Sequence, residues 1–321
     1  MATAEQVKAL IQTHFADERE QFATIALQLA AHEARQGHTA LAHDIRTLVD
    51  RSKARSVQIA GFNQDLDDLV ISSQPRYRLG DLIVSDDMRN RIMRILREYK
   101  QQDKLKKHGM DNRRKILLAG PPGTGKTMTA AVLAGELHLV LHTILMDKLV
   151  TKFMGETSAK LRQIFDVIRV RRGVYLFDEF DAIGGERGRD NDVGEMRRVL
   201  NAFLQFIEQD RSESLIVAAT NNPRILDQAL FRRFDDVLYY HLPTEADIWR
   251  LIKNRLGRFR SDGLMMDAAI QEGRTLSHAE ITQACDDAIK EAILTDQDTV
   301  SSALLESMLQ ERRSAYGKDQ G

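Results

Sequence analysis

The sequence predicts an α/β protein with a five-stranded parallel sheet in the middle layer of three layers. Helical regions precede and follow this part of the chain. Three observations support this fold. Short apolar runs alternate with longer helical stretches between about Leu79 and His241. A glycine-rich segment follows directly after one of these runs, as in sheets that bind ligands at their strand ends. Before and after this region, apolar residues recur only at helical spacing.

The expected strands are short and apolar throughout, which is typical of strands that helices cover on both faces. Their alternation with helices favours an open parallel sheet. They cover residues 115–119, 140–145, 174–177, 215–219 and 237–240.

The flanking regions define the remaining parts of the chain. Residues 1–58 carry apolar side chains at helical spacing and predict a helical bundle. Gly61, Ser72, Ser73 and Pro75 indicate a linker. The expected division is therefore a helical bundle over 1–58, a linker over 59–78, an α/β domain over 79–243, a small helical domain over 244–312 and a tail over 313–321.

Composition excludes several classes of protein. The chain has 46 Lys and Arg against 47 Asp and Glu, so its net charge of −1 gives no general attraction to nucleic acid. Its single cysteine, Cys285, excludes an intrachain disulfide and a cysteine-based zinc site. No apolar run is long enough to span a membrane, and the N-terminus lacks the apolar core of a signal peptide. We expect a cytoplasmic protein.

The most informative motif is Gly-Pro-Pro-Gly-Thr-Gly-Lys-Thr at residues 120–127, directly after an apolar strand. This pattern indicates a phosphate-binding loop, in which glycines bring backbone N–H groups close to phosphates. Lys126 is expected to reach the β- and γ-phosphates of a nucleotide, and the Thr127 hydroxyl to bind Mg²⁺. The alternative is a glycine-rich turn without a ligand.

Two carboxylates end the apolar strand at 174–177. Beside a phosphate loop, Asp178 is expected to hold Mg²⁺, and Glu179 to act as the general base that activates the attacking water. The alternative is a strand that ends in a solvated acidic turn. Asp181 is expected to support these residues.

A further strand ends in Asn221-Asn222-Pro223. The Asn221 amide can both donate and accept, as a residue that orients the attacking water must. Asn222 and Pro223 are more typical of a turn.

Two adjacent arginines, Arg232 and Arg233, follow an apolar helical stretch. They belong either to a solvated surface or to a neighbouring subunit's active site, where a guanidinium stabilises transition-state charge. Sequence order does not decide between these alternatives.

The ordered motifs GPPGTGKT, LFDEFD, AATNN and ALFRRFDD resemble the AAA family of ATPases (the AAA+ superfamily) over about residues 79–310. In that family they are the Walker A motif, the Walker B motif, sensor 1 and the arginine fingers. The adjacent arginines are similar to those of the katanin and spastin branch, whereas the family pattern often reads RPGRFD.

The resemblance implies a P-loop AAA+ module with a helical lid, ATP and Mg²⁺ as ligands, and a ring, usually a hexamer, with ATP sites between subunits. Its expected catalytic residues are Lys126, Glu179, Asn221, Arg232 and Arg233. The expected nucleotide contacts are Gly120, Pro121, Pro122, Gly123, Thr124, Gly125, Lys126, Thr127, Met128 and, from the lid, Ala279.

A further segment resembles the first pore loop of AAA proteins that thread polypeptides. It reads Leu-Val-Thr-Lys-Phe-Met-Gly-Glu-Thr, and its expected substrate-contacting residues are Lys152, Phe153, Met154 and Gly155. An aromatic ring beside a flexible thioether can grip many side chains without reading their sequence. The alternative places Phe153 and Met154 in the core. Residues 184–192 are either a second pore loop or a connector.

Two functions remain open at this point. The first is an ATP-driven motor that unfolds, threads or disassembles proteins, with a substrate, an adaptor or a separate protease bound by residues 1–58. The second is a nucleotide-switched assembly or loading factor that acts on another enzyme or on nucleic acid without threading. The pore-loop resemblance favours the first, and the near-neutral charge disfavours nucleic acid.

Overall fold

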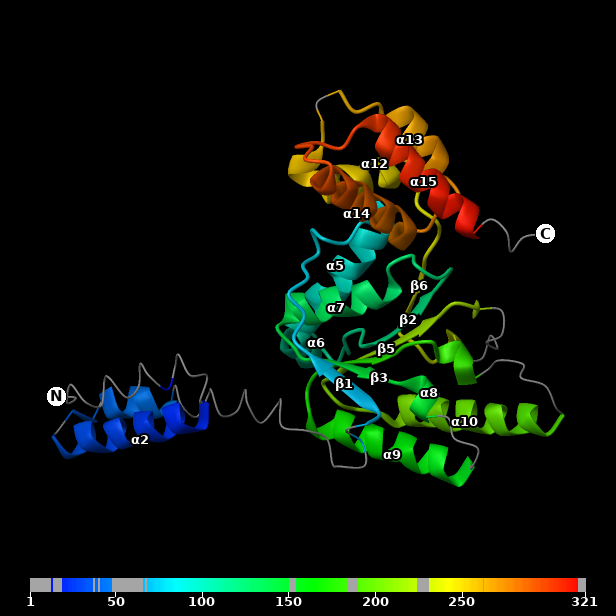
Figure 1. Cartoon of the computed structure of the whole chain (residues 1–321). Helices are drawn as coiled ribbons and strands as arrows, with labels where there is room; N and C mark the ends of the chain where they lie inside the picture. Colours follow the sequence, from blue (N-terminus) through cyan, green and yellow to red (C-terminus); the bar gives the residue numbers. More distant parts are fainter. Residues whose placement is uncertain are drawn as a thin grey trace. The chain divides into compact units, whose positions relative to one another are not determined.

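The computed structural model describes residues 13, 19–36, 38–39, 41–47, 66, 68–149, 154–183, 190–223, 231–261 and 263–316. The chain divides into two units, Met1–Gly61 and Phe62–Gly321. In the first unit, α2 spans Arg19–Arg35 and a second helical segment covers residues 41–47 (Figure 1). Ala26, Ala30 and Ala42 are buried there.

The second unit contains a six-stranded sheet in the order β1-β3-β4-β5-β2-β6. The five strands predicted from the sequence are all present and mutually parallel, which confirms the α/β fold. Their bounds are β2 Lys115–Ala119, β3 Leu141–Ile144, β4 Val174–Phe177, β5 Leu215–Thr220 and β6 Asp236–Tyr239.

The sixth strand lies within the segment predicted as a linker. β1 spans Val70–Ser73 and pairs antiparallel with β3, with Val70 opposite Ile144. Only Val70 of this strand is buried, because β1 forms the edge of the sheet. An edge strand needs no continuous apolar run, so its two serines favoured a linker instead.

Helices cover both faces of the sheet (Figure 1). Side chains of β2 alternate between the faces. Ile116 and Leu118 pack with α5 and α7, whereas Leu117 packs with α9 and α10. The helices of this domain are α5 Asp86–Lys100, α6 Gln102–Lys107, α7 Lys126–Leu137, α8 Met146–Leu149, α9 Met154–Val170, η1 Phe180–Ile183 and α10 Asp190–Gln209.

A helical domain with its own apolar core follows the sheet. Its elements are α12 Glu245–Leu256, η3 Gly257–Phe259, α13 Met266–Gly273, α14 His278–Leu294 and α15 Ser302–Tyr316. Thr244 and Ser277 begin α12 and α14 with capping boxes. In each box the side-chain oxygen of the first residue accepts from the backbone N–H three residues later, and the carboxylate of that later residue accepts from the first residue's N–H. α15 continues to Tyr316, so the predicted tail from 313 begins inside this helix.

Among the described residues, no helix combines the length and the apolar character needed to cross a membrane.

Candidate functional site

The glycine-rich segment forms the turn between the end of β2 and the start of α7. Gly120, Gly123 and Gly125 have φ values of 150°, 70° and 100°, a region that favours glycine. A Cβ at Gly120 would lie 2.3 Å from the Tyr240 carbonyl oxygen. The backbone path of this loop therefore depends on glycine, and α7 directs its N-terminal N–H groups into the turn, where an anion is stabilised.

Lys126 is almost fully buried at the start of α7. Its Nζ donates to the carbonyl oxygens of Gly120 at 2.8 Å and Pro121 at 2.7 Å. Burial lowers the pKa of this ammonium, while the carboxylates of Asp178 and Asp181 act in the opposite direction. The ammonium is thus held inside the loop, where we expect it to meet phosphate oxygens.

Other residues of the loop differ in their contacts and exposure. Thr124, which is buried, donates its hydroxyl to the Pro121 carbonyl at 2.7 Å. Met128 is partly buried against the core on the α5 and α7 face. Pro122 is exposed. The nucleotide contacts predicted for these residues remain predictions.

Thr127 and Asp178 come together from different elements. The Thr127 hydroxyl donates to the Asp178 carboxylate at 2.7 Å, which joins the start of α7 to the end of β4. Both groups present oxygen, the ligand that Mg²⁺ prefers, and phosphate oxygens and water complete such sites. These two residues therefore fit the predicted magnesium site.

Glu179 lies at a sharp turn after β4. Its φ of 52° is in the left-handed region, which a residue other than glycine adopts at a cost. Its N–H donates to the Asp178 carboxylate at 3.0 Å, and its own carboxylate is exposed. No hydrogen bond or ion pair engages that carboxylate among the described residues. It is thus available to a water, as a general base must be.

Asn221 directly follows β5, the strand beside β4, and its side chain is exposed. Its N–H donates to the Asp181 carboxylate at 3.2 Å. Asp181 therefore links the two strand ends, in keeping with the supporting position expected for it. The Asn222 N–H donates to the Thr220 hydroxyl at 3.1 Å, which fits the turn predicted there.

The start of α14 contacts the phosphate loop directly. The Ala279 N–H donates to the Gly123 carbonyl at 2.9 Å, so Ala279 is beside the loop. A Cβ at Gly123 would lie 2.5 Å from the Ser277 hydroxyl oxygen and 3.3 Å from the Ala279 Cβ. Burial lowers the pKa of His278, which lies between these two residues.

The two arginines differ in their surroundings. Arg232 is exposed, whereas the Arg233 Nε lies 3.1 Å from the Glu208 carboxylate. Sequence analysis did not identify Glu208, because nothing in the pattern of α10 indicates that its C-terminal end lies beside residue 233.

Two other contacts at the loop were not predicted from the sequence. Leu82, which is buried, would lie 3.6 Å from a Cβ at Gly125. The Thr129 and Tyr240 hydroxyls lie 2.6 Å apart behind the loop. Three non-adjacent segments meet here, and no spacing in the sequence signals that meeting.

The predicted pore loop falls mostly outside the described residues. Lys152 and Phe153 lie in the gap at 150–153, and residues 184–189 of the second candidate loop lie in another gap. Met154 and Gly155 open α9, and the backbone alone is described for them.

Comparisons with known proteins agree with this geometry. Residues 116–242 match the family described as "ATPase family associated with various cellular activities (AAA)". An uncharacterized AAA family ATPase of Sinorhizobium fredii is 31% identical over 322 residues, which covers 97% of this chain and 96% of that protein.

Two further relatives are longer than the aligned region. A proteasome-activating nucleotidase of Methanopyrus kandleri is 32% identical over 72% of this chain and 55% of its own length. A putative ribosome biogenesis ATPase of Dictyostelium discoideum is 34% identical over 53% of this chain and 20% of its own length. The phosphate loop, the paired carboxylates and these similarities lead to one conclusion: the chain belongs to the AAA family and is an ATPase.

Proposed function

We propose that this ATPase assembles into a hexameric ring, in which a neighbouring subunit completes each ATP site. The observation that carries this proposal is the exposed guanidinium of Arg232. It belongs to a motif that resembles the arginine fingers, and no acidic partner engages it among the described residues. An exposed arginine can stabilise transition-state charge when the γ-phosphate of an ATP bound to a neighbouring subunit lies beside it.

Within one subunit, each of five described residues has its own role in hydrolysis. Lys126 holds the β- and γ-phosphates, and Asn221 orients the attacking water. Glu179 accepts a proton from that water as the water attacks the γ-phosphate, the bond from the γ-phosphorus to the bridging oxygen breaks, and ADP leaves. Thr127 and Asp178 hold Mg²⁺, which when bound neutralises charge on the phosphate oxygens.

We further propose that hydrolysis moves a protein substrate through the centre of the ring. Two observations support this. The pore-loop sequence overlaps the start of α9 at Met154 and Gly155, and one relative is named for activating a proteasome. The first unit of the chain then binds the substrate, an adaptor or a separate protease. Without threading, the same ATPase cycle would serve as an assembly switch.

A photo-crosslinking experiment separates threading from switching. Benzoylphenylalanine replaces Phe153 in one variant and the exposed α9 residue Gln163 in the control, and casein serves as an unfolded substrate. We expect ATP-dependent crosslinks from position 153 and none from position 163. Phe153→Ala should remove casein stimulation of the ATPase but keep the basal rate. Equal crosslinking from both positions, or an unchanged response of Phe153→Ala, would reject the threading proposal.

A further inference from the structure

Adjacent in sequence, Arg232 and Arg233 have different electrostatic partners. The Arg233 Nε lies 3.1 Å from a Glu208 carboxylate oxygen, and 31% of the Arg233 side chain is exposed. Arg232 is exposed and takes part in no ion pair or hydrogen bond among the described residues. One guanidinium is therefore already occupied within its own subunit, and the other is available to a second molecule.

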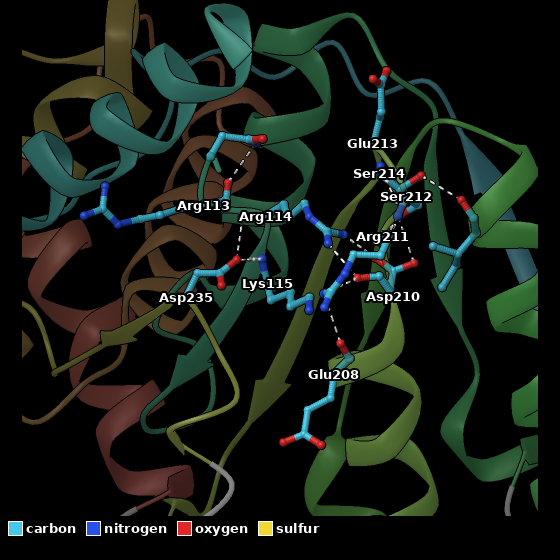
Figure 2. Close-up of polar contacts among 12 residues, drawn as sticks. Arg113, Arg114, Lys115, Glu208, Asp210, Arg211, Ser212, Glu213, Ser214 and Asp235 are labelled. Carbon is cyan, nitrogen blue, oxygen red and sulfur yellow. Dashed lines mark hydrogen bonds and ion pairs between the residues drawn. The ribbon is translucent and has the colours of Figure 1, made fainter. Parts of the chain in front are cut away.

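Glu208 lies in the last turn of α10, whose C-terminal end favours nearby cations. Its backbone carbonyl accepts a hydrogen bond from the Arg211 guanidinium at 3.2 Å. Figure 2 shows that its carboxylate points away from the other labelled polar groups. Arg233 is thus the partner that the structure gives to this carboxylate.

The chain after the arginine pair is fixed to the start of β2 (Figure 2). The Asp235 carboxylate accepts hydrogen bonds from the backbone N–H groups of Arg114 and Lys115, each at 2.9 Å. The Asp235 N–H returns a bond to the Lys115 carbonyl at 2.8 Å. These three bonds set the position of the backbone two residues beyond Arg233.

The end of α10 is fixed to the same point. Asp210 is fully buried, and its carboxylate pairs with the Arg114 guanidinium. Arg114 also donates to the Asp210 carbonyl at 2.6 Å. The segments that carry Glu208 and Arg233 are therefore both hydrogen-bonded to the start of β2. The Glu208–Arg233 ion pair adds a direct contact between these two segments.

From this arrangement we infer that Arg232 is the residue that contacts the neighbouring subunit's γ-phosphate, and that Arg233 is a positioning residue that acts through Glu208. The inference rests on the proposed function, because it requires an ATP site shared between subunits. The Glu208–Arg233 pair is exposed enough that it contributes little to folding stability. Its loss should therefore reduce the rate of hydrolysis without unfolding the chain.

A charge exchange tests the inference. Arg232→Ala should lower kcat by about a thousandfold or more, with unchanged ATP affinity. Glu208→Arg and Arg233→Glu should each lower kcat by about tenfold, because like charges then replace the ion pair that positions Arg232. The double variant restores an ion pair of reversed polarity and should recover at least about threefold over Arg233→Glu. A residue that itself contacts phosphate could not be replaced by glutamate.

A milder variant guards against misfolding. Glu208→Gln should lower kcat in the same direction as Glu208→Arg, whereas Glu213→Gln should leave it unchanged. Glu213 is a matched control because it also forms an exposed ion pair, with Lys106 at 2.8 Å. Thermal melting confirms that each variant is folded.

The outcomes separate the two proposals. If Arg232→Ala abolishes turnover but the double variant stays as slow as Arg233→Glu, the positioning inference is overturned and the shared site survives. If Arg232→Ala keeps the normal rate, the shared site with Arg232 as its contributor is rejected, and this inference with it.

Discussion

The backbone amide of Ala279 donates a hydrogen bond to the carbonyl of Gly123 at 2.9 Å, and so joins the start of α14 to the phosphate loop. This bond lies between two backbones, so substitution of Ala279 would not remove it. Access to the loop therefore depends on how closely α14 can approach Gly123, which in turn depends on the missing side chain at that glycine.

Gly123→Ala should weaken nucleotide binding more than backbone strain alone can explain. The new Cβ would lie 2.5 Å from the Ser277 hydroxyl oxygen and would push α14 off the loop. Gly109→Ala is the control, because it has the same φ of 70° and nothing within 4 Å. Both variants lose about 1 kcal/mol of stability from the left-handed backbone. A fluorescent ATP analogue should show a higher Kd for Gly123→Ala only; equal Kd values would contradict the importance of the contact between α14 and Gly123.

Gly135→Ala should destabilise the fold although alanine favours helices. Gly135 lies inside α7, where replacing glycine with alanine would ordinarily raise the free energy of unfolding by about 1 kcal/mol. Here the Cβ would lie 2.2 Å from the Tyr77 carbonyl oxygen, and backbone cannot yield as a flexible side chain does. Urea unfolding should give a lower free energy of unfolding for Gly135→Ala than for Gly80→Ala, whose Cβ meets nothing within 4 Å. A stabilised Gly135→Ala would disprove this close crossing.

Lys126→Ala and Glu179→Gln should separate nucleotide binding from hydrolysis. Loss of the buried ammonium should remove ATP binding, because nothing else in the loop carries positive charge among its described side chains. Glu179→Gln keeps the shape of the side chain but cannot accept a proton, so it should bind ATP and turn over at least about a hundredfold more slowly. Equilibrium binding and single-turnover rates measure the two effects. Normal turnover by Glu179→Gln would exclude this carboxylate as the base.

Stability should fall as the pH is lowered from about 6.5 to about 4, through His142. Burial, assisted by the Arg171 charge, lowers the pKa of His142 from 6.5 to about 4. In that interval the unfolded chain binds the proton more tightly than the folded chain, so acid favours unfolding by on the order of 3 kcal/mol. His142→Phe should reduce this pH dependence in chemical unfolding, whereas the exposed His241→Asn should not. Identical pH profiles for all three proteins would rule out His142 as the source.

The sequence predicted the parts of the fold that apolar burial dictates. Strands β2 to β5 are buried almost throughout and β6 is partly buried. All five were visible as apolar runs, whereas edge strand β1 has one buried residue and was not. The phosphate loop was predictable because its chemistry is continuous in sequence. The Ala279–Gly123 and Glu208–Arg233 contacts join segments far apart in the chain, and no local pattern encodes them.

The left-handed backbone at Glu179 was also invisible in the sequence, because glutamate does not favour that conformation. The chain adopts it directly after β4, where the Glu179 N–H donates to the carboxylate of the preceding residue, Asp178. Such exceptions to local preference are expected where function constrains the chain.

The most direct test of the shared ATP site mixes two inactive proteins. Lys126→Ala subunits keep Arg232, and Arg232→Ala subunits keep an intact phosphate loop. We predict that rings containing both, confirmed by mass measurement, recover ATPase activity, because one subunit supplies the arginine to the other's ATP. Mixed rings without any recovered activity would contradict a site completed between subunits.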